Sequence, residues 1–203
     1  MHLTFPSPAL PADIFTAHEI ILELRAQLAR LESLAMLDPL TCIANRRAFD
    51  DHLSAAYAHA QRTRSPLAVA VLDVDNFKLR NDTWGHADGD RCLTALAAQL
   101  TAHSRRADTV ARIGGEEFAL ILPNTSEAEA AEICQRIAAT VRNSCGIVPL
   151  TFSAGVAHLD STMADASTIV DYADRAMYQA KQAGKDRVFI HQPRFRRSVF
   201  KWK

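Results

Sequence analysis

The stretch "PLAVAVLDVD", residues 66–75, decides the fold. Its apolar residues follow one another without the alternation of a strand that has one face in water, and the run ends in two acids, Asp73 and Asp75. Short continuous apolar runs of this kind are typical of a central strand that is buried on both faces. The stretch therefore predicts the middle strand of a sheet, with carboxylates where the strand meets the surface.

Helical and strand patterns alternate on either side of this strand. A helix is expected after "NRRAF", capped by Asn45 and running to about Arg64. Beyond the strand we expect a turn region, a helix at about 87–104, strands "TVARI" and "FALIL", a helix at 126–143, strand "PLTFSAGVA", a helix at 165–183 and strand "RVFI". This order, with one hairpin, predicts a mixed sheet flanked by helices, of the α+β or α/β class.

The two ends of the chain fall outside this pattern. Residues 1–12 contain three prolines and are expected to form an extended leader. Over 13–37, apolar residues recur at alternating three- and four-residue steps, which predicts a helix that either packs on its own domain or joins two copies in a parallel coiled coil. Residues 38–191 are expected to form the globular domain. Residues 192–203 form a basic tail with interleaved aromatics, which we interpret as a disordered terminus rather than a nucleic-acid or membrane contact.

The composition excludes several classes of protein. Among 203 residues, Lys plus Arg and Asp plus Glu each number 23, which argues against nucleic acid or a membrane surface as a partner. No apolar run approaches the about 20 residues of a membrane span, and the start lacks a secretory signal. The four cysteines form no CxxC pair and are expected to be reduced thiols, which indicates a cytoplasmic protein.

The stretch "RIGGEEFAL", residues 112–120, places two acids on a glycine turn between two strands. Gly114 and Gly115 permit a turn with positive φ, and their missing side chains let a polyphosphate approach the backbone. If the hairpin lies beside the strand that ends at Asp73, then Glu116 and Asp73 can share one or two Mg²⁺ ions, as two-metal phosphoryl transfer requires. Sequence spacing does not show that these strands are neighbours, so the acids are either turn residues or metal ligands.

Five motifs spread over residues 37–190 resemble the GGDEF family of diguanylate cyclases. "RIGGEEF" looks like the family signature in its GGEEF form. "DPLTCIANRRAF", "DVDNFKLRNDTWGHADGD", "TFSAGVA" and "ADRAMYQAKQAGKDRV" are similar to the other family motifs, in the same order. The resemblance implies a nucleotidyl-cyclase or polymerase-palm-like domain that condenses two GTP molecules into cyclic di-GMP and releases two pyrophosphates. It also implies a homodimer in which each protomer holds one GTP.

The resemblance also implies roles for individual residues in metal binding and catalysis. Asp73 and the backbone carbonyl of Val74 would bind Mg²⁺, or Mn²⁺ in its place. Glu116 would be both a metal ligand and the general base for the ribose 3′-hydroxyl, which needs a metal and a carboxylate to attack near neutral pH. Glu117 either supports the turn and the metal shell or takes a direct part. Lys78 would stabilise charge on the phosphates.

Substrate recognition follows from the same resemblance. Lys181 and Lys185 would grip the β and γ phosphates. Asn81 and Asp90 would read guanine, whose adjacent N1–H and N2–H₂ donors a carboxylate accepts together, and an unpaired acid there would reject adenine. His86 either faces the substrate or holds its own loop.

A second nucleotide site is implied by "RRAD" upstream of the signature. Arg105 and Asp108 match the family's RxxD site, at which the product inhibits the enzyme, and Arg136 would contribute from the next helix. The sequence departs from the family at Cys42 and Ala44, where Gly and Pro are usual, and "GKD" at 184–186 replaces the commoner Gly-Arg-Asn. Lysine keeps the charge there but loses the bidentate fork of arginine.

Two functional classes remain open on the sequence alone. One is an active cyclase, and the other is a module that binds GTP or cyclic di-GMP without turnover and acts on a partner protein. The signature acids and the metal aspartate are all present, which favours the enzyme. No recognisable sensor domain fits in the remaining residues, so an upstream sensor domain or protein is expected to supply the signal.

Overall fold

The computed structural model describes residues 18–25, 27, 36–142, 149–160, 163 and 165–192. The chain separates into two compact units, residues 1–36 and 37–203. In the first unit, residues 18–25 and 27 are helical and exposed. Of the helix predicted over 13–37, residues 36 and 37 are not helical, and the remaining residues lie outside the described part of the chain. Leu37 forms an isolated antiparallel bridge with Ala44, so the helical conformation ends before it.

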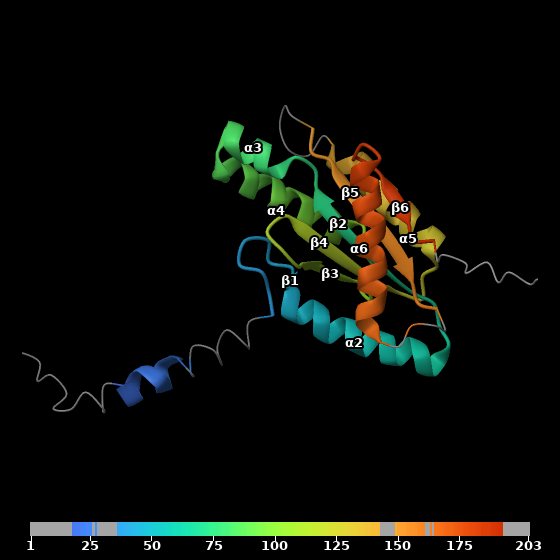
Figure 1. The fold of residues 1–203 in the computed structure, drawn as a ribbon, viewed down its shortest axis with the longest axis horizontal. Coiled ribbons are helices and arrows are strands. Elements are labelled where there is room, and N and C mark those ends of the chain that lie inside the picture. Colours follow the sequence, from blue (N-terminus) through green and yellow to red (C-terminus); the bar gives the residue numbers. More distant parts are fainter. Residues whose placement is uncertain are drawn as a thin grey trace, which may run out of the picture. The chain divides into compact units, whose positions relative to one another are not determined.

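The second unit is built on a mixed six-stranded sheet in the order β1-β3-β4-β2-β5-β6 (Figure 1). The central strand β2 pairs antiparallel with β4 and with β5, β3 pairs antiparallel with β4, and the edge strands β1 and β6 pair parallel with β3 and β5. The strands are β1 (Ala44–Asn45), β2 (Leu67–Val74), β3 (Thr109–Arg112), β4 (Glu117–Pro123), β5 (Phe152–His158) and β6 (Val188–Ile190). The predicted fold class is confirmed.

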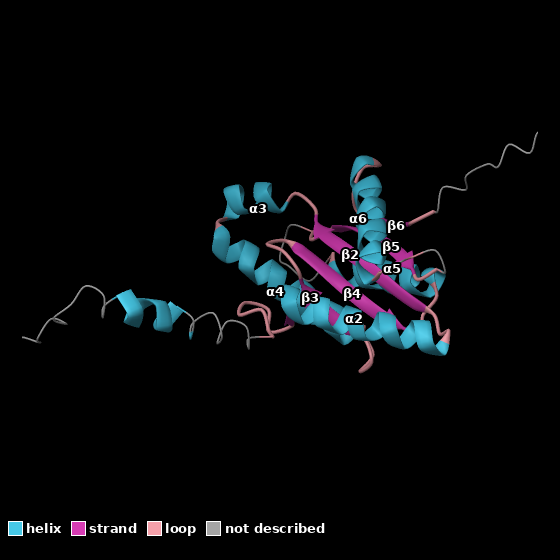
Figure 2. Cartoon of the chain, turned by 60° about the horizontal axis from the view of Figure 1, so that its bottom comes forward, coloured by secondary structure: helices cyan, strands magenta, loops and turns pink. Residues whose placement is uncertain are grey.

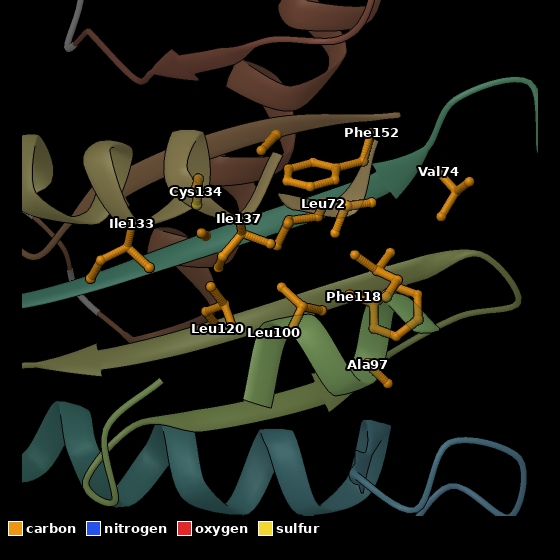
Figure 3. Packing of buried hydrophobic residues seen from close by; sticks show 14 of the residues in the cluster. Leu72, Val74, Ala97, Leu100, Phe118, Leu120, Ile133, Cys134, Ile137 and Phe152 are labelled. Atoms are coloured by element: carbon orange, nitrogen blue, oxygen red, sulfur yellow. The ribbon is translucent and has the colours of Figure 1, made fainter. Parts of the chain in front are cut away.

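Helices cover both faces of the sheet, and β2 is buried along its whole length (Figure 2). One face packs on α4 (His86–Ala102) and α5 (Glu127–Val141), through a cluster that includes Leu72, Leu100 and Ile137 (Figure 3). The other face packs on α2 (Arg46–Thr63) and α6 (Ala166–Gln182), through Phe49, Val71 and Met177. The continuous apolar run of β2 therefore reflects two cores rather than one.

Local sequence signals explain where the helices begin. Asn45 caps α2, because its side-chain oxygen accepts a hydrogen bond from the N–H of Ala48 at 3.0 Å, as predicted. Ser126 and Glu129 form a reciprocal capping box at the start of α5. These bonds satisfy N–H groups that have no partner inside the helix.

Two elements differ from the prediction. The region expected to be a turn before residue 87 contains a helix, α3 (Phe77–Trp84), which is joined to α4 at Gly85. Gly85 has φ 83°, a conformation that a residue with a side chain rarely adopts, so the glycine lets the chain change direction between the two helices. The second difference is β1, because its two residues were expected to lead into the helix and not to form a strand.

The expectation of four reduced thiols is wrong at Cys92, which is disulfide-bonded, whereas Cys42 and Cys134 are free. Cys134 is buried in the core, and burial raises the pKa of its thiol to about 12. None of the helices in the described part of the chain has the length and apolarity that a membrane crossing requires.

Gly155 on β5 lets α6 lie directly against the sheet. A Cβ atom at this position would lie 2.0 Å from the carbonyl oxygen of Ala173 and 2.1 Å from the amide nitrogen of Met177. Both are backbone atoms of α6, so a side chain could be accommodated only by moving the helix.

We expect a Gly155→Val variant to lose about 3 kcal/mol or more of the free energy of unfolding, as overpacked cores do. Urea denaturation followed by circular dichroism measures the loss. Gly115→Ala is the matched control, because a Cβ atom at Gly115 meets no atom within 4 Å, and its stability should change by less than about 0.5 kcal/mol. Equal stabilities for the two variants would contradict the proposed contact between β5 and α6.

Candidate active site

The register of the central strands brings the predicted acids together. Asp73, near the end of β2, lies opposite Glu117 at the start of β4. The N–H of Val74 donates to the carbonyl of Glu116 at 3.2 Å, which places the turn of the signature beside the end of β2. The sequence left open whether these strands are neighbours, and the structure shows that they are hydrogen-bonded to each other.

Lys181 reaches the same point from α6, which packs on one face of the sheet. Its Nζ lies 2.7 Å from Oδ2 of Asp73, and the side chain of Asp73 is only 8% exposed. The other carboxylate oxygen of Asp73, Oδ1, is buried and has no hydrogen-bond partner. Lys181 therefore neutralises one oxygen of Asp73, while the other is buried without a hydrogen-bond partner.

The charges at this end of the sheet repel one another. Burial, followed by the charge of Asp75, raises the pKa of Asp73, and this outweighs the opposing effects of Lys181 and Lys185. Burial also raises the pKa of Glu116, and the charges of Asp73 and Glu117 add to the effect. A group of carboxylates with raised pKa values is stabilised by a cation, which favours their charged forms.

The side chains fit a magnesium ion in chemical type. Asp73 and Glu116 supply hard carboxylate oxygens, and Mg²⁺ usually takes one or two carboxylates and completes its shell with water and phosphate oxygens. Within the described ranges, no group of three or more His, Cys, Asp or Glu residues forms a ready-made metal cage.

The two glycines of the signature differ from the prediction. Neither Gly114 nor Gly115 has a positive φ, so the expectation of a left-handed turn is wrong. Gly114 gives room to the Glu117 side chain instead, because a Cβ atom there would lie 2.2 Å from its Oε2 and would displace the end of that side chain. The Glu117 side chain folds back over this glycine, while the N–H of Ile113 donates to the Glu117 carbonyl at 2.9 Å and closes the turn.

The loop between α6 and β6 carries the second predicted phosphate-binding lysine. Gly184, Lys185 and Asp186 all have positive φ values, of 111°, 64° and 49°. The Nζ of Lys185 donates to Oδ1 of Asn76 at 2.5 Å, which holds this side chain beside the end of β2. Lys181 and Lys185 thus approach the same strand end from two directions.

The predicted guanine-reading residues lie on α3 and α4. Asn81 packs against the backbone at Gly89, where a Cβ atom would lie 2.0 Å from its Oδ1. This Oδ1 is buried without a hydrogen-bond partner, whereas Asp90 and His86 are exposed on α4. Lys78 is exposed on α3.

Three buried side-chain oxygens lack a hydrogen-bond partner in the part of the chain that the structure describes. They are Oδ1 of Asp73, of Asn81 and of Asp186. The first lies at the proposed metal position, the second at the proposed guanine position, and the third in the loop of the proposed phosphate-binding lysine. Because buried polar atoms are normally paired, their concentration here favours a ligand with several polar groups.

The RxxD residues form a local turn. The backbone N–H of Arg105 donates to Oδ2 of Asp108 at 2.7 Å, and the N–H of Asp108 donates to the carbonyl of Arg105 at 3.0 Å. The side chain of Arg105 is exposed. The pKa of Glu129 is lowered mainly by hydrogen bonds from Ser126, and the charge of Arg105 lowers it further. Arg136 is exposed further along α5.

A cavity of about 1410 Å³ opens beside Asp73, Glu117 and Lys181 and continues along α6 towards Tyr172 and His191. Its size suits a nucleotide, but Asn81 and Asp90 do not line it. The buried carboxylate and the lysines locate the reaction centre better than this open groove, since they carry the chemistry.

Sequence reasoning missed an arginine that ties the signature turn to the start of the domain. Arg112 donates from Nη2 to the carbonyl of Gly115 at 2.7 Å, and from Nη1 to both carboxylate oxygens of Asp38 at 3.1 and 3.2 Å. Asp38 also accepts from the backbone N–H and the hydroxyl of Thr41. The arginine directly before the Ile-Gly-Gly sequence was visible in the sequence, but nothing there paired it with an acid 74 residues earlier.

Cys42 follows in the same loop and has φ 57°, the left-handed region that favours glycine. The family's usual glycine at this position therefore has a conformational reason.

Asp38 should make stability depend on pH. Burial raises the pKa of Asp38, but the hydrogen bonds from Thr41 and the Arg112 guanidinium outweigh it, so the pKa is lowered. A lowered pKa contributes stability above the ordinary carboxyl value of about 3.9, and this stability is lost as the pH falls through the folded-state pKa. We expect the stability difference between the native chain and Asp38→Asn to be constant from pH 7 to 5 and to shrink below about pH 4. Denaturation series across this range measure it, and a difference that persists unchanged at pH 3 would contradict the assignment.

Comparisons with known proteins identify the family to which the chain belongs. Residues 35–187 match the family described as "Diguanylate cyclase, GGDEF domain", and the chain belongs to this family. It is 38% identical over 162 residues to diguanylate cyclase DgcP of Pseudomonas aeruginosa, which covers 77% of this chain and 24% of that protein. It is 36% identical over 158 residues to diguanylate cyclase DosC of Escherichia coli, covering 75% of this chain and 34% of that one.

Solved structures show the same fold. The GGDEF domain of DgcB from Caulobacter crescentus, in complex with c-di-GMP, superposes with a TM-score of 0.74 at 34% identity and covers 78% of this chain and 97% of that one. The active GGEEF domain of a diguanylate cyclase from Vibrio cholerae superposes with a TM-score of 0.71 at 33% identity and covers 74% and 99%. The chain spans between about a quarter and a half of the length of the curated relatives DgcP, YhcK and DgcT.

Proposed function

We propose that this chain is an active diguanylate cyclase of the GGEEF form, which condenses two GTP molecules into cyclic di-GMP and releases two pyrophosphates. The observation that carries the proposal is the convergence of Asp73, Glu116 and Lys181 at one end of the sheet. Family membership and the c-di-GMP complex of the DgcB domain support the same substrate class.

A Mg²⁺ ion held at this site would supply positive charge to favour attack by the ribose 3′-hydroxyl of one GTP and to offset the phosphate charge of the other. Asp73 and Glu116 would hold the metal, with the Val74 carbonyl as a further ligand. Glu116 takes the hydroxyl proton as the general base. Glu117 folds over Gly114 and supports the turn that presents Glu116.

The remaining residues position the nucleotide. Lys181 and Lys185 bind the β and γ phosphates, and Lys78 stabilises the charge that develops on the phosphate under attack. Asn81 and Asp90 read the guanine edge. His86, at the start of α4, contacts the substrate from the same side.

The reaction needs two half-sites, since each protomer holds one GTP and each hydroxyl must attack the other nucleotide. The chain therefore works as a homodimer. The exposed apolar residues of the helical segment at 18–25, such as Ile21 and Leu24, are suited to self-association, since they are 48% and 58% exposed.

The test is incubation with GTP and Mg²⁺, followed by separation of the products. Pyrophosphate and cyclic di-GMP should both appear, and specific activity should fall on dilution as the dimer dissociates. If micromolar protein yields neither product but still binds GTP, the chain is a nucleotide-binding module instead. Specific activity that is constant across dilution would argue against the dimer.

Product inhibition is expected at Arg105, Asp108 and Arg136. The exposed guanidinium of Arg105 can bind a phosphate of cyclic di-GMP. An Arg105→Ala variant should raise the inhibition constant of cyclic di-GMP about tenfold, the effect of losing one charged hydrogen bond. Rate measurements at increasing product concentration give the constant. The neighbouring Arg106→Ala is the control, and equal inhibition of both variants would remove Arg105 from the site.

A further inference from the structure

We propose that Asp75 is a positioning residue that fixes the phosphate-binding loop at 184–186, and so sets where Lys185 meets the polyphosphate of the substrate. The proposal rests on the function proposed above. It assigns a task to the second acid of the "LDVD" sequence, which neither the metal site nor guanine recognition uses.

Asp75 directly follows the central strand β2, and its carboxylate contacts residues at the start of β5 and in the loop before β6. Its Oδ1 accepts from the hydroxyl of Ser153 at 2.7 Å, and its Oδ2 accepts from the hydroxyl of Thr151 at 2.9 Å. Oδ2 also accepts from the backbone N–H of Asp186 at 2.9 Å. The carboxylate is buried, 8% exposed, and is thus occupied by donors rather than aimed at a ligand.

The bond to Asp186 is one of several contacts that hold this loop. The N–H of Lys185 donates to the carbonyl of Ala180 at 3.1 Å, and Arg142 pairs with the Asp186 carboxylate at 2.7 Å. Three consecutive residues, 184–186, are in left-handed conformations, and two of them carry side chains that make this conformation costly. Such a segment keeps its shape only when surrounding contacts determine it. The Asp75 carboxylate supplies a contact at the last of the three residues, next to Lys185.

The residue after Asp75 holds the side chain of the same loop. Oδ1 of Asn76 accepts a hydrogen bond from the ammonium of Lys185. Oδ2 of Asp75 accepts one from the backbone N–H of Asp186. Two consecutive residues at the end of β2 therefore fix the backbone and the charged end of the loop. Asp73, the proposed metal ligand, lies two residues before Asp75. The end of β2 therefore positions both Asp73 and Lys185, the proposed phosphate-binding lysine.

The sign of the effect separates positioning from simple electrostatics. Asp75 carries a negative charge close to the phosphates, so removing only that charge should strengthen the binding of an anion. Removing the support of the loop should weaken it. Asp75→Ala removes both the charge and the acceptor, whereas Asp75→Asn removes the charge and keeps one acceptor oxygen for the N–H of Asp186.

The experiment measures binding of inorganic tripolyphosphate with Mg²⁺ by calorimetry on the full chain, without turnover. Asp75→Ala should raise its dissociation constant about tenfold, and Asp75→Ser, which also withdraws the acceptor but leaves a smaller space, should act in the same direction. Asp75→Asn should bind tripolyphosphate as tightly as the native chain or up to about twofold more tightly. GMP, which lacks the β and γ phosphates, should bind all four proteins equally.

Two controls distinguish positioning from general damage. Ser153→Ala removes the donor to the other oxygen of Asp75 and does not touch the loop, so it should lower the melting temperature without changing tripolyphosphate affinity. In a Lys185→Ala background, Asp75→Ala should have no further effect on tripolyphosphate, because Asp75 acts through that lysine.

Unchanged or tighter tripolyphosphate binding in Asp75→Ala and Asp75→Ser would overturn the proposal and leave Asp75 as a nearby charge. An equal loss of GMP and tripolyphosphate affinity would overturn it as well, because the damage would then be general. If the native chain binds neither GTP nor tripolyphosphate and makes no cyclic di-GMP, the proposed function itself fails. Normal turnover and binding by the native chain, with no change in the Asp75 variants, would reject this inference alone.

Discussion

A Glu116→Gln variant is expected to keep its fold and to lose about three orders of magnitude in the rate of cyclic di-GMP formation, since a general base alone contributes 10²–10⁴-fold. Glutamine has nearly the same shape as glutamate, but it cannot take a proton and is a weak ligand for Mg²⁺. The measurement is initial-rate product analysis at saturating GTP and Mg²⁺.

The same variant should not be less stable than the native chain. Burial and the charge of Asp73 raise the pKa of Glu116, so its charged form is disfavoured in the folded protein at neutral pH. A neutral side chain relieves that repulsion, and the melting temperature should be equal or higher. Glu132→Gln, an exposed substitution on α5, is the control with native activity. More than a tenth of native activity in Glu116→Gln would show that this carboxylate is neither base nor essential ligand.

An Asp73→Asn variant is expected to lose activity by a similar factor, about 10³-fold, and not to recover it at high Mg²⁺ concentration. Asp73 carries the buried oxygen without a partner, and its other oxygen pairs with Lys181. The amide would weaken the metal site and leave the ammonium of Lys181 without its partner. Activity across a Mg²⁺ titration measures the first effect.

Metal binding can be followed without turnover. Mn²⁺ binding in the presence of a non-hydrolysable GTP analogue, measured by electron paramagnetic resonance, should weaken in Asp73→Asn. Asp50→Asn on α2 is the control, because the Asp50 side chain is 59% exposed and pairs with Arg46 at the surface. Restoration of activity by excess Mg²⁺ would show that Asp73 tunes metal affinity and is not required for the reaction.

The central strand and the helices with clear apolar periodicity could be predicted from the sequence, because burial on two faces leaves an unbroken apolar run. The helix α3 could not, because only Phe77 among its residues is buried. Its polar residues, Asn81 and Asp82 among them, and the glycine that follows are also typical of turns. A helix held mainly at one end and exposed elsewhere carries little of the periodic signal on which such predictions depend.

The site could be predicted as a set of residue types, but its assembly could not. Asp73 and Glu117 lie opposite each other only because of the register between β2 and β4. The pairing of Arg112 with Asp38 joins residues that are 74 positions apart in the sequence. Gly114 was expected to adopt a positive φ, whereas it provides room for the Glu117 side chain. A glycine in a sequence does not distinguish these two reasons.

The close approach of α6 to Gly155 has a consequence for how the site responds to a ligand. Backbone atoms of α6 lie where a side chain of β5 would be, so sliding or rotating this helix would bring it into collision with the strand. Met177 lies at the contact between α6 and Gly155, and Lys181 follows it by one helical turn. Strand β5 pairs directly with β2, the strand that carries Asp73. The distance from the base of Lys181 to Asp73 is thus set by a rigid frame. Release of Asp73 to an incoming cation must come from rotation about the lysine's own side-chain bonds, and so needs no rearrangement of the domain.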